Sequence, residues 1–433
     1  MTAAAAPWLL AGIPLAGALL SLFAWANAAR LRTSAVLVSA ITFGAAIGLT
    51  GRLASPPEGA LLLYLLPVAA CVSLLGQPLH HDHRLSWVAT LLLLGLGLGV
   101  LALPTIGGPL FLMLLLGCLI ALLYRYHTPL WPISWLGIGT YGFGAMCAAV
   151  SMIAGRPFSA AASLLACATL LPLVPFHEGH VTSITRLPGS LPSFIVLLLP
   201  ALGLHGLAAV LPAAPGPIAW IVTLLAMAGS LYGAVKALAQ SRVRLLLAYG
   251  SLSFFSMVWW FAASAGHATS QASVFIGAAG FATSGLLLAW QVIRTRYGDD
   301  VDPQAISGLA FTMPRYAVLL SLLALAAMGL PPFGVFAAFM GLFLNTPISS
   351  ALGPFIMLLA WLTASWYVMR MAQQLLFGTR RSDLRYADLI HTEFASLFIV
   401  VLVLLALGVT PSNLFAPARN ATAATMDSIA WQK

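Results

Sequence analysis

The chain has 433 residues, of which 61% are apolar and 7% are charged, and its mean hydropathy is +1.00. A soluble domain carries about 25% charged residues, because polar groups must cover its surface. The composition therefore excludes a soluble globular protein and predicts an integral membrane protein. The formal net charge of +9 does not require a nucleic-acid partner, because cationic loops orient membrane proteins and attract anionic lipid headgroups.

Runs of about 20 apolar residues, the length that crosses about 30 Å of hydrocarbon, follow one another along the chain. The first, residues 7–29, is long enough to span and lacks the cleavage site of a signal peptide, so we expect a retained helix. In chain order, we predict 14 spans that begin near residues 7, 33, 60, 86, 107, 134, 157, 191, 217, 250, 268, 314, 352 and 393. The sequence shows no alternating segments of about ten residues, which excludes an outer-membrane barrel and makes the fold class all-α.

Two of these spans contain prolines that should break a helix. The seventh contains Pro172 and Pro175, and the twelfth contains Pro331 and Pro332. The boundaries of these two spans are the hardest to place from the sequence.

The cations of the loops predict the orientation, because Lys and Arg favour cytoplasmic loops. If the N-terminus lies outside, thirteen arginines fall in the inner loops: Arg30, Arg32, Arg84, Arg125, Arg186, Arg242, Arg244, Arg294, Arg296, Arg315, Arg380, Arg381 and Arg385. Only four cations then fall outside: Arg52, Arg156, Arg419 and Lys433. This asymmetry predicts an even number of spans, with both ends of the chain outside. Lys236 and Arg370 remain, and both fall within predicted spans.

Neither metals nor cofactors are expected in this chain. The four cysteines lie in apolar spans without metal-ligand spacing, so we interpret them as small core residues: Cys71, Cys118, Cys147 and Cys167. The histidine-rich loop at residues 80–83 has ligand-type side chains but no supporting set around it. The sequence also lacks cysteine sets for iron–sulfur clusters and the glycine motifs that bind nucleotides.

The stretch LYGAVKALAQSRVRLLLAYGSLSFFSM, residues 231–257, places Lys236 near a helix end and follows it with Gln240, Arg242 and Arg244. It resembles the Y-G-A-x-x-A-x-x-Q-x-D-x-K-R-x-x-A-Y-S-S-x-S segment of the antiporter-like subunits of NADH:quinone oxidoreductase. The same family includes subunits of membrane-bound hydrogenases, multisubunit cation/proton antiporters and inorganic-carbon-accumulating complexes.

Other stretches resemble the family in the same order along the chain. PLVPFH, residues 172–177, is similar to the family's P-F-H element, and GHATSQASVFIGAAG places His267 on the histidine of H-A-x-x-K. GLAFTMPRYAVLLSLLALAAMGLPPFGVF, residues 308–336, is similar to the helix that contains G-L-P-P. LTASWYVMRM and Glu393 also match, so that the resemblance extends from about residue 110 to residue 412.

The resemblance implies a fold with two inverted five-helix repeats, each containing a broken helix. It divides the chain into N-terminal transmembrane helices at 1–106, an antiporter-like core at 107–412 and a short external tail at 413–433. Irregular backbone at membrane depth is tolerated only where it is buried in protein or lines a wet cavity. The resemblance therefore places His177 at a break, near the cytoplasmic end of a proton path.

Several charged residues of the family are replaced here. In the family, the first half of the fold carries a glutamate in its fifth span and a lysine before P-F-H. Here no Asp or Glu lies between Asp82 and Glu178, and Leu170 occupies the position of the lysine. Three further charged positions are uncharged and one acid is replaced by a base: Ala201, Gln271, Phe339 and Arg242. All ten carboxylates fall in loops or at span ends. A pump of this type needs partner charges to tune its lysines, so the complete circuit is absent and a degenerate path is expected.

Lys236, His177 and His267 are the candidates for one hydrated path. A charge at a helix centre costs about 2.5–3.5 kcal/mol, so Lys236 needs either a role in transport or a position from which it reaches water. Arg370 matches a family arginine and is expected either to gate the second half or to contact lipid. His205 replaces a family tyrosine, which favours a structural role over proton transfer.

Glu178 and His180 are expected to lie in a loop that cytoplasmic water wets. A cationic cytoplasmic face is expected to dock an acidic partner through Arg242, Arg244, Arg380, Arg381 and Arg385. Family members of this kind leave the reaction centre to a partner, so no catalysis is expected in this chain alone. The partner is either a redox module or a zinc-containing module that resembles carbonic anhydrase, and the translocated ion is H⁺ or Na⁺.

A structural scaffold that kept the helices and lost transport is the alternative function. In either case, the expected location is a bacterial-type inner membrane.

Reporter domains fused to the two ends of the chain should both give the signal of the external side, because the loop charges predict an even number of spans. The measurement is the activity of reporters that work on only one side of the membrane. A reporter at one end that works inside would show that the number of spans is odd.

Overall fold

The computed structural model of the chain describes residues 5–23, 27–49, 57–79, 84–103, 107–127, 133–155, 158–213, 216–298, 306–347, 351–378 and 387–409. These residues form helices joined by short connections, and none of them is in a strand. The α-helices are α1 (Ala6–Phe23), α2 (Ala28–Leu49), α3 (Pro57–Leu75), α4 (Arg84–Ala102), α5 (Gly107–Arg125), α6 (Trp135–Ile153), α7 (Phe158–Leu170), α8 (Glu178–Arg186), α9 (Leu191–Val210), α10 (Gly216–Leu238), α11 (Val243–Ala265), α12 (Ser270–Tyr297), α13 (Leu309–Thr312), α14 (Pro314–Ala327), α15 (Gly334–Asn345), α16 (Leu352–Leu376) and α17 (His391–Val409). One 3₁₀ turn, η4, covers Leu211–Ala213.

Within the described part of the chain, 11 helices are long and apolar enough to cross a membrane by length and composition. Four shorter apolar helices lie in α3, α7, α14 and α15. A helix begins near each of the predicted span starts, which confirms the all-α polytopic class. The total of 14 spans remains a prediction, because it depends on how the short and broken helices cross.

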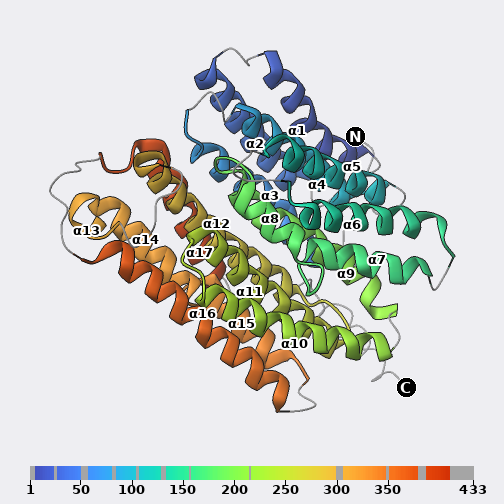
Figure 1. Cartoon of the computed structure of the whole chain (residues 1–433). Coiled ribbons are helices and arrows are strands. Elements are labelled where there is room, and N and C mark those ends of the chain that lie inside the picture. The colour runs from blue at the N-terminus through green and yellow to red at the C-terminus, as the bar shows by residue number, and fades with distance from the viewer. Residues whose placement is uncertain are drawn as a thin grey trace, which may run out of the picture.

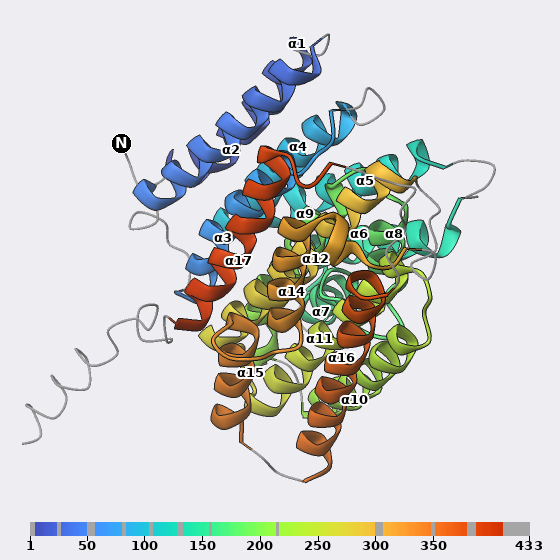
Figure 2. The same cartoon turned by 90° about the vertical axis from the view of Figure 1, so that its left-hand side faces the viewer.

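The long helices run side by side, with the N-terminal helices at one edge and α16 at the opposite edge (Figures 1 and 2). Four central helices are mostly buried: 72% of the most apolar stretch of α9 is buried, 89% in α4 and α11, and 100% in α12. The corresponding values for α1, α2, α5, α6, α10, α16 and α17 lie between 28% and 39%. A helix that is apolar all round and exposed on one side is suited to hydrocarbon, so these outer helices form the face expected to meet lipid.

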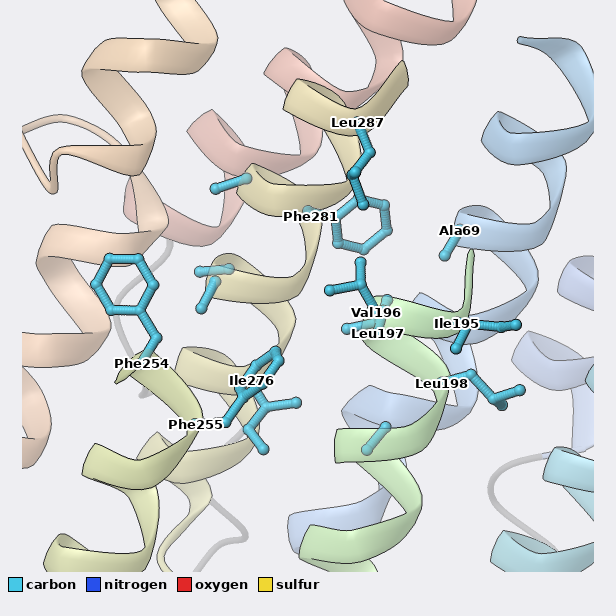
Figure 3. Close-up of a cluster of buried hydrophobic side chains, with 14 of the residues drawn as sticks. Ala69, Ile195, Val196, Leu197, Leu198, Phe254, Phe255, Ile276, Phe281 and Leu287 are labelled. Atoms are coloured by element: carbon cyan, nitrogen blue, oxygen red, sulfur yellow. The ribbon is translucent and has the colours of Figure 1, made fainter. Parts of the chain in front are cut away.

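The centre of the bundle is packed with large apolar side chains (Figure 3). Helix α9 lies between α3 and α12, and its Leu197 and Leu198 side chains are fully buried. Phe254 and Phe255 of α11 and Phe281 of α12 continue the same core. This core joins the two halves of the chain into one packed unit.

Both proline-containing spans are broken, as the sequence predicts. Helix α7 ends at Leu170 and α8 begins at Glu178, whereas α14 ends at Ala327 and α15 begins at Gly334. Each break contains one cis peptide bond before a proline, Val174–Pro175 in the first and Pro331–Pro332 in the second. The inverted relation of two repeats and the domain limits at residues 106 and 412 stay predictions.

Short turns connect α11 to α10 at one end and to α12 at the other, so α10 and α12 finish at the same end of the bundle. We call it the arginine-rich end, because Lys236, Arg242, Arg294 and Arg296 lie there. Across this end, Arg296 of α12 forms an ion pair with Glu393 of α17, with 2.7 Å between Nη2 and Oε2.

Arg244 fastens the turn between α8 and α9 to the first turn of α11. Its guanidinium donates to the carbonyl oxygens of Thr185, Leu187 and Gly189 at 3.1–3.3 Å and to the side-chain oxygen of Gln291 on α12. The turn requires a residue with φ of +58° at Gly189, a conformation that is strained for any side chain. One half-buried cation therefore satisfies the carbonyl groups of a turn that has no helix to bond them.

Arg244→Gln should lower the stability of the folded chain by about 2–4 kcal/mol, because several hydrogen bonds from a charged donor to carbonyl groups are lost together. The measurement is the melting temperature in detergent. The matched control is Arg242→Gln, which changes an exposed arginine two residues earlier and should melt close to the parent. Equal melting of the two variants would show that the Arg244 contacts do not stabilise the turn.

Candidate functional site

The break between α7 and α8 exposes carbonyl groups that no helix satisfies, and α11 supplies donors to them. The indole Nε1 of Trp259 donates to the carbonyl oxygen of Leu171 at 3.0 Å, and the hydroxyl of Ser256 donates to that of Pro172 at 3.5 Å. Pro172 and Pro175 prevent α7 from continuing, which is why these carbonyl groups are free. The broken segment is therefore held at a fixed position against α11.

Helix α8 is short and amphipathic, and it packs its polar side chains inward. His180 is fully buried, and its Nε2 lies 2.9 Å from the hydroxyl of Ser251 on α11. The Tyr141 hydroxyl of α6 forms a 2.8 Å hydrogen bond with Ser183. The expectation that His180 lies in a loop wetted by water is therefore wrong, because α8 turns this face toward α6 and α11. Glu178, in the first turn, is half-buried.

His177 lies at the start of α8 with an exposed fraction of 6%. The backbone of Pro175 lies beside its ring, but neither ring nitrogen makes a hydrogen bond of normal geometry with a described residue. Its Nε2 is 3.6 Å from Oε1 of Glu178, which is a contact between an imidazole and a carboxylate rather than a hydrogen bond. The rings of Tyr232 and Tyr249 lie 5.4 Å and 6.5 Å from the imidazole centre. A buried imidazole with two unsatisfied nitrogens indicates a place where water completes the hydrogen bonds.

Lys236 follows Tyr232 by one turn of α10, and its Nζ lies 5.8 Å from the centre of the Tyr232 ring. The side chain of Lys236 is exposed in the last turn of α10, so the ammonium group reaches the arginine-rich end. Gly233 permits this arrangement, because a Cβ there would lie 2.7 Å from the backbone nitrogen of Ser253 on α11. The close approach of α10 and α11 places Tyr232 beside Tyr249, with 6.1 Å between the ring centres.

The structure brings His177 and Lys236 into one cluster through Tyr232, but the other path candidates lie elsewhere. His267 is exposed in the turn between α11 and α12, where its Nδ1 lies 3.0 Å from the carbonyl oxygen of Ala265. The 23 residues of α11 extend over about 35 Å at 1.5 Å per residue, so His267 is at the opposite end from Lys236. His205 is half-buried on α9.

Among the expected docking residues, Arg242 is exposed at the start of α11, and Arg244 is engaged by the α8–α9 turn. Arg380, Arg381, Arg385 and the histidine-rich loop at residues 80–83 lie outside the described residues.

The two tyrosines of the cluster, Tyr232 and Tyr249, were not recognised as site residues from the sequence. Both stand in the stretch that carries the family resemblance, but 17 positions separate them. Only the antiparallel packing of α10 and α11 brings them to His177. Small residues one helical turn apart in α10, Gly229 and Gly233, are the sequence signal for such close packing.

No Asp, Glu, Lys or Arg is among the buried side chains of the described residues; the buried polar groups are those of Ser, Thr, Gln and His, with the hydroxyl or indole N–H of Tyr and Trp. Leu170 and Ala201, which occupy lysine positions of the resembling family, are 2% and 0% exposed. The first half therefore has a polar cluster near the arginine-rich end and an apolar centre.

Aromatic rings surround the second break, where the hydroxyl of Ser365 on α16 donates to the carbonyl oxygen of Met328 at 3.0 Å. Phe339 of α15 is 2% exposed, and its ring centre lies 3.9 Å from that of Trp361 on α16. The ring centres of Phe261 and Phe275 lie 6.0 Å and 6.4 Å from that of Phe339. The ring centre of Phe254 lies 6.0 Å from that of Trp361. This aromatic cluster, defined by these five residues, leaves the second half without the charged side chain that the resemblance would place at Phe339.

Residues 111–366 match the protein family described as NADH:quinone oxidoreductase/Mrp antiporter, TM. The chain belongs to this family. The match covers both broken helices and the α10–α11 pair, so the polar cluster and the aromatic cluster lie within the antiporter-family part of the chain.

Relatives with curated descriptions are similar over part of their length. F(420)H(2) dehydrogenase subunit M of Methanosarcina mazei is 30% identical over 262 residues, which are 56% of this chain and 50% of that protein. NADH-quinone oxidoreductase subunit M of Pseudomonas aeruginosa is 28% identical over 280 residues, 61% of this chain and 52% of that protein. The antiporter-family chain thus spans about half the length of the curated relatives it matches.

Solved structures share the fold over nearly the whole chain. A chain of respiratory complex I from Thermus thermophilus with bound NADH has a TM-score of 0.79 at 20% identity, over 94% of this chain and 96% of that one. A chain of the Mrp complex from Dietzia sp. has a TM-score of 0.77 at 15% identity, over 94% and 95% of the two chains. At these identities the likeness shows the fold.

Phe339→Ala should lower stability by about 3–5 kcal/mol, because it removes a ring from a closely packed aromatic cluster and leaves a cavity. The measurement is the melting temperature in detergent. Phe355→Ala is the control, since Phe355 of α16 is 64% exposed and has little packing to lose. A Phe339→Ala variant that melts with the control would show that the second break is loosely packed.

Proposed function

We propose that this antiporter-family chain is the membrane subunit of a multi-subunit ion-translocating complex and carries a degenerate proton path through its first half. The path opens at the arginine-rich end, beside Lys236, and continues past Tyr232 to His177. The reaction that drives or uses the proton movement takes place in a partner subunit.

The unsatisfied imidazole of His177 carries this proposal. A buried nitrogen without a hydrogen bond costs about 1–3 kcal/mol, and His177 has two such nitrogens. Water between His177, the Glu178 carboxylate and the two tyrosine hydroxyls would remove this cost and connect the groups by hydrogen bonds. Histidine suits the transfer of protons, because its ordinary pKa lies near neutral pH.

The exposed position of Lys236 supports an entry at the arginine-rich end. An ammonium group in the last turn of α10 reaches water without crossing hydrocarbon, so it has no large insertion cost to offset. In this position Lys236 sets the local potential beside Tyr232, and His177 is the group that accepts and releases the proton. His267, exposed at the other end of α11, and His205 on α9 are proposed only as groups near the far exit.

The aromatic cluster supports conduction through one half. Water and ions avoid a space that aromatic rings fill at van der Waals distance. The centre of the first half is also apolar at Leu170 and Ala201, so conduction there needs water that enters transiently. The proposed path is degenerate in this sense: its centre lacks the charged side chains of a complete path.

A partner with zinc chemistry like that of carbonic anhydrase suits the chain better than a redox module. A complex that lets protons move down their gradient needs a proton-conducting chain, whereas a pump needs lysines coupled to carboxylates. We propose that this partner docks at the arginine-rich end of a subunit in a bacterial-type inner membrane, with both ends of the chain outside. The exposed side chain of Arg242 belongs to that docking face.

A scaffold that has lost transport is the second candidate function. The observation in its favour is the absence of buried Asp, Glu, Lys and Arg among the described residues. On this alternative, the His177 cluster only fills space between α8, α10 and α11.

The whole complex, reconstituted in vesicles, distinguishes the two functions. His177→Ala should reduce proton-dependent activity at least about tenfold, which corresponds to about 1.4 kcal/mol in the barrier, while the complex still assembles. Lys236→Met should reduce it less, because Lys236 acts through the local potential. The measurement is activity with and without an uncoupler, together with the subunit composition by size-exclusion chromatography.

His127→Ala is the matched control, since His127 is an exposed histidine just beyond the end of α5 and outside the cluster. It should leave activity unchanged. Assembly with full, uncoupler-sensitive activity in His177→Ala would reject the proton path and support the scaffold.

A further inference from the structure

We propose that a small cavity at the arginine-rich end, between the α10–α11 turn and α16, binds the phosphate of an anionic phospholipid from the adjacent leaflet. The cavity is separate from the His177 cluster, and its function does not depend on proton conduction.

The cavity has a volume of about 100 Å³, and its polar lining comes from Gln240 and Ser241 in the turn and from Tyr367, Arg370 and Gln374 on α16. Since about 10–15 Å³ measured in this way is enough to hold one water, this space can hold several waters or one compact tetrahedral anion. Side-chain amides, hydroxyls and a guanidinium are the donors that phosphate oxygens accept.

Tyr367 of α16 belongs to this lining, and its hydroxyl lies against Gly250 of α11. Tyr367 is 2% exposed, yet the structure gives its hydroxyl no hydrogen bond within the described part of the chain. A buried hydroxyl is normally satisfied. A ligand or water in the cavity is therefore the group that Tyr367 is placed to meet.

Positive charge and helix geometry favour an anion as the occupant. Arg370 lines the cavity and makes no hydrogen bond or ion pair with another described residue. Helix α11 begins at the cavity, and its N-cap residue Arg242 gives it no side-chain capping bond, so peptide N–H groups of the first turn remain available. The opposite partial charge at the end of α10 is offset by Lys236 in its last turn.

The surface next to the cavity favours a lipid over a free anion. Leu362 and Trp366 lie eight and four residues before Arg370 on α16, on the same side of the helix, and their exposed fractions are 65% and 68%. Val235 of α10 is 61% exposed on the neighbouring helix. This exposed apolar stripe ends at the cavity, so acyl chains can follow it while the headgroup reaches Arg370. Tryptophan at the level of the headgroups is typical of the membrane interface.

Lipid titration of the purified full chain, with the subunits that co-purify, tests the site. Native mass spectrometry measures the bound lipid with dioleoyl phosphatidylglycerol, and separately with the neutral dioleoyl phosphatidylcholine. One saturable phosphatidylglycerol site should appear. Arg370→Gln should lower its affinity for phosphatidylglycerol at least about fivefold, because it removes one cation beside the headgroup. Tyr367→Phe, which keeps the ring packing, should weaken it about threefold.

Two controls keep the result specific. Arg370→Lys preserves the charge and should retain most of the affinity, whereas Arg125→Gln removes an exposed arginine from the last turn of α5 and should bind like the parent. Unchanged phosphatidylglycerol binding in Arg370→Gln would overturn the proposal. Equal binding of phosphatidylcholine would also overturn it, as would complete competition by millimolar inorganic phosphate, which would identify a free-anion site.

Discussion

The backbone of the first break must be satisfied without help from bulk water, and the rest of the site depends on how this is done. An unpaired carbonyl group in hydrocarbon costs several kcal/mol. Here Trp259 and Ser256 of α11 meet the free carbonyl groups of the break, and Arg244 meets those of the following turn. Helix α11 is therefore the element on which α8 is built, and α10, α12 and α16 cover its other faces.

The same packing explains why a polar cluster survives at His177. Once α8 is fixed on α11, its polar face can lie inside protein, as the hydrogen bond between His180 and Ser251 shows. The close approach at Gly233 adds α10 to the arrangement and brings Tyr232 to the imidazole. Polar groups in this fold are thus retained where three helices meet and can hydrogen-bond one another, and charged groups stay at the ends, where water is near.

The two breaks have the same kind of backbone interruption but different surroundings. Around the first, hydroxyl, indole and imidazole groups provide donors and acceptors. Around the second, the rings of Phe339 and Trp361 pack closely at a tilt of 33° within a larger set of rings. The surroundings of the two breaks therefore differ, and this asymmetry is the physical basis of the one-sided path that we propose. It also makes the arginine-rich end the place where we propose that lipid and a partner subunit bind.

The sequence by itself determined the class of the protein, because hydrocarbon imposes a length and an apolar composition on every span. It also indicated the two breaks, because two prolines close together remove helix hydrogen bonds and favour an interruption. The single prolines Pro14, Pro67 and Pro200, by contrast, lie inside α1, α3 and α9. It did not determine the surroundings of His180, which the sequence placed in water, because the covered face of a nine-residue helix depends on its neighbours. Likewise, the sequence did not show that Lys236 and His267 lie at opposite ends of α11, and their place on one path stays a prediction. The roles of Arg244 and Tyr232 were also decided only by tertiary structure. Their partners are carbonyl groups and rings on other helices, and contacts between distant segments leave no local pattern in the sequence.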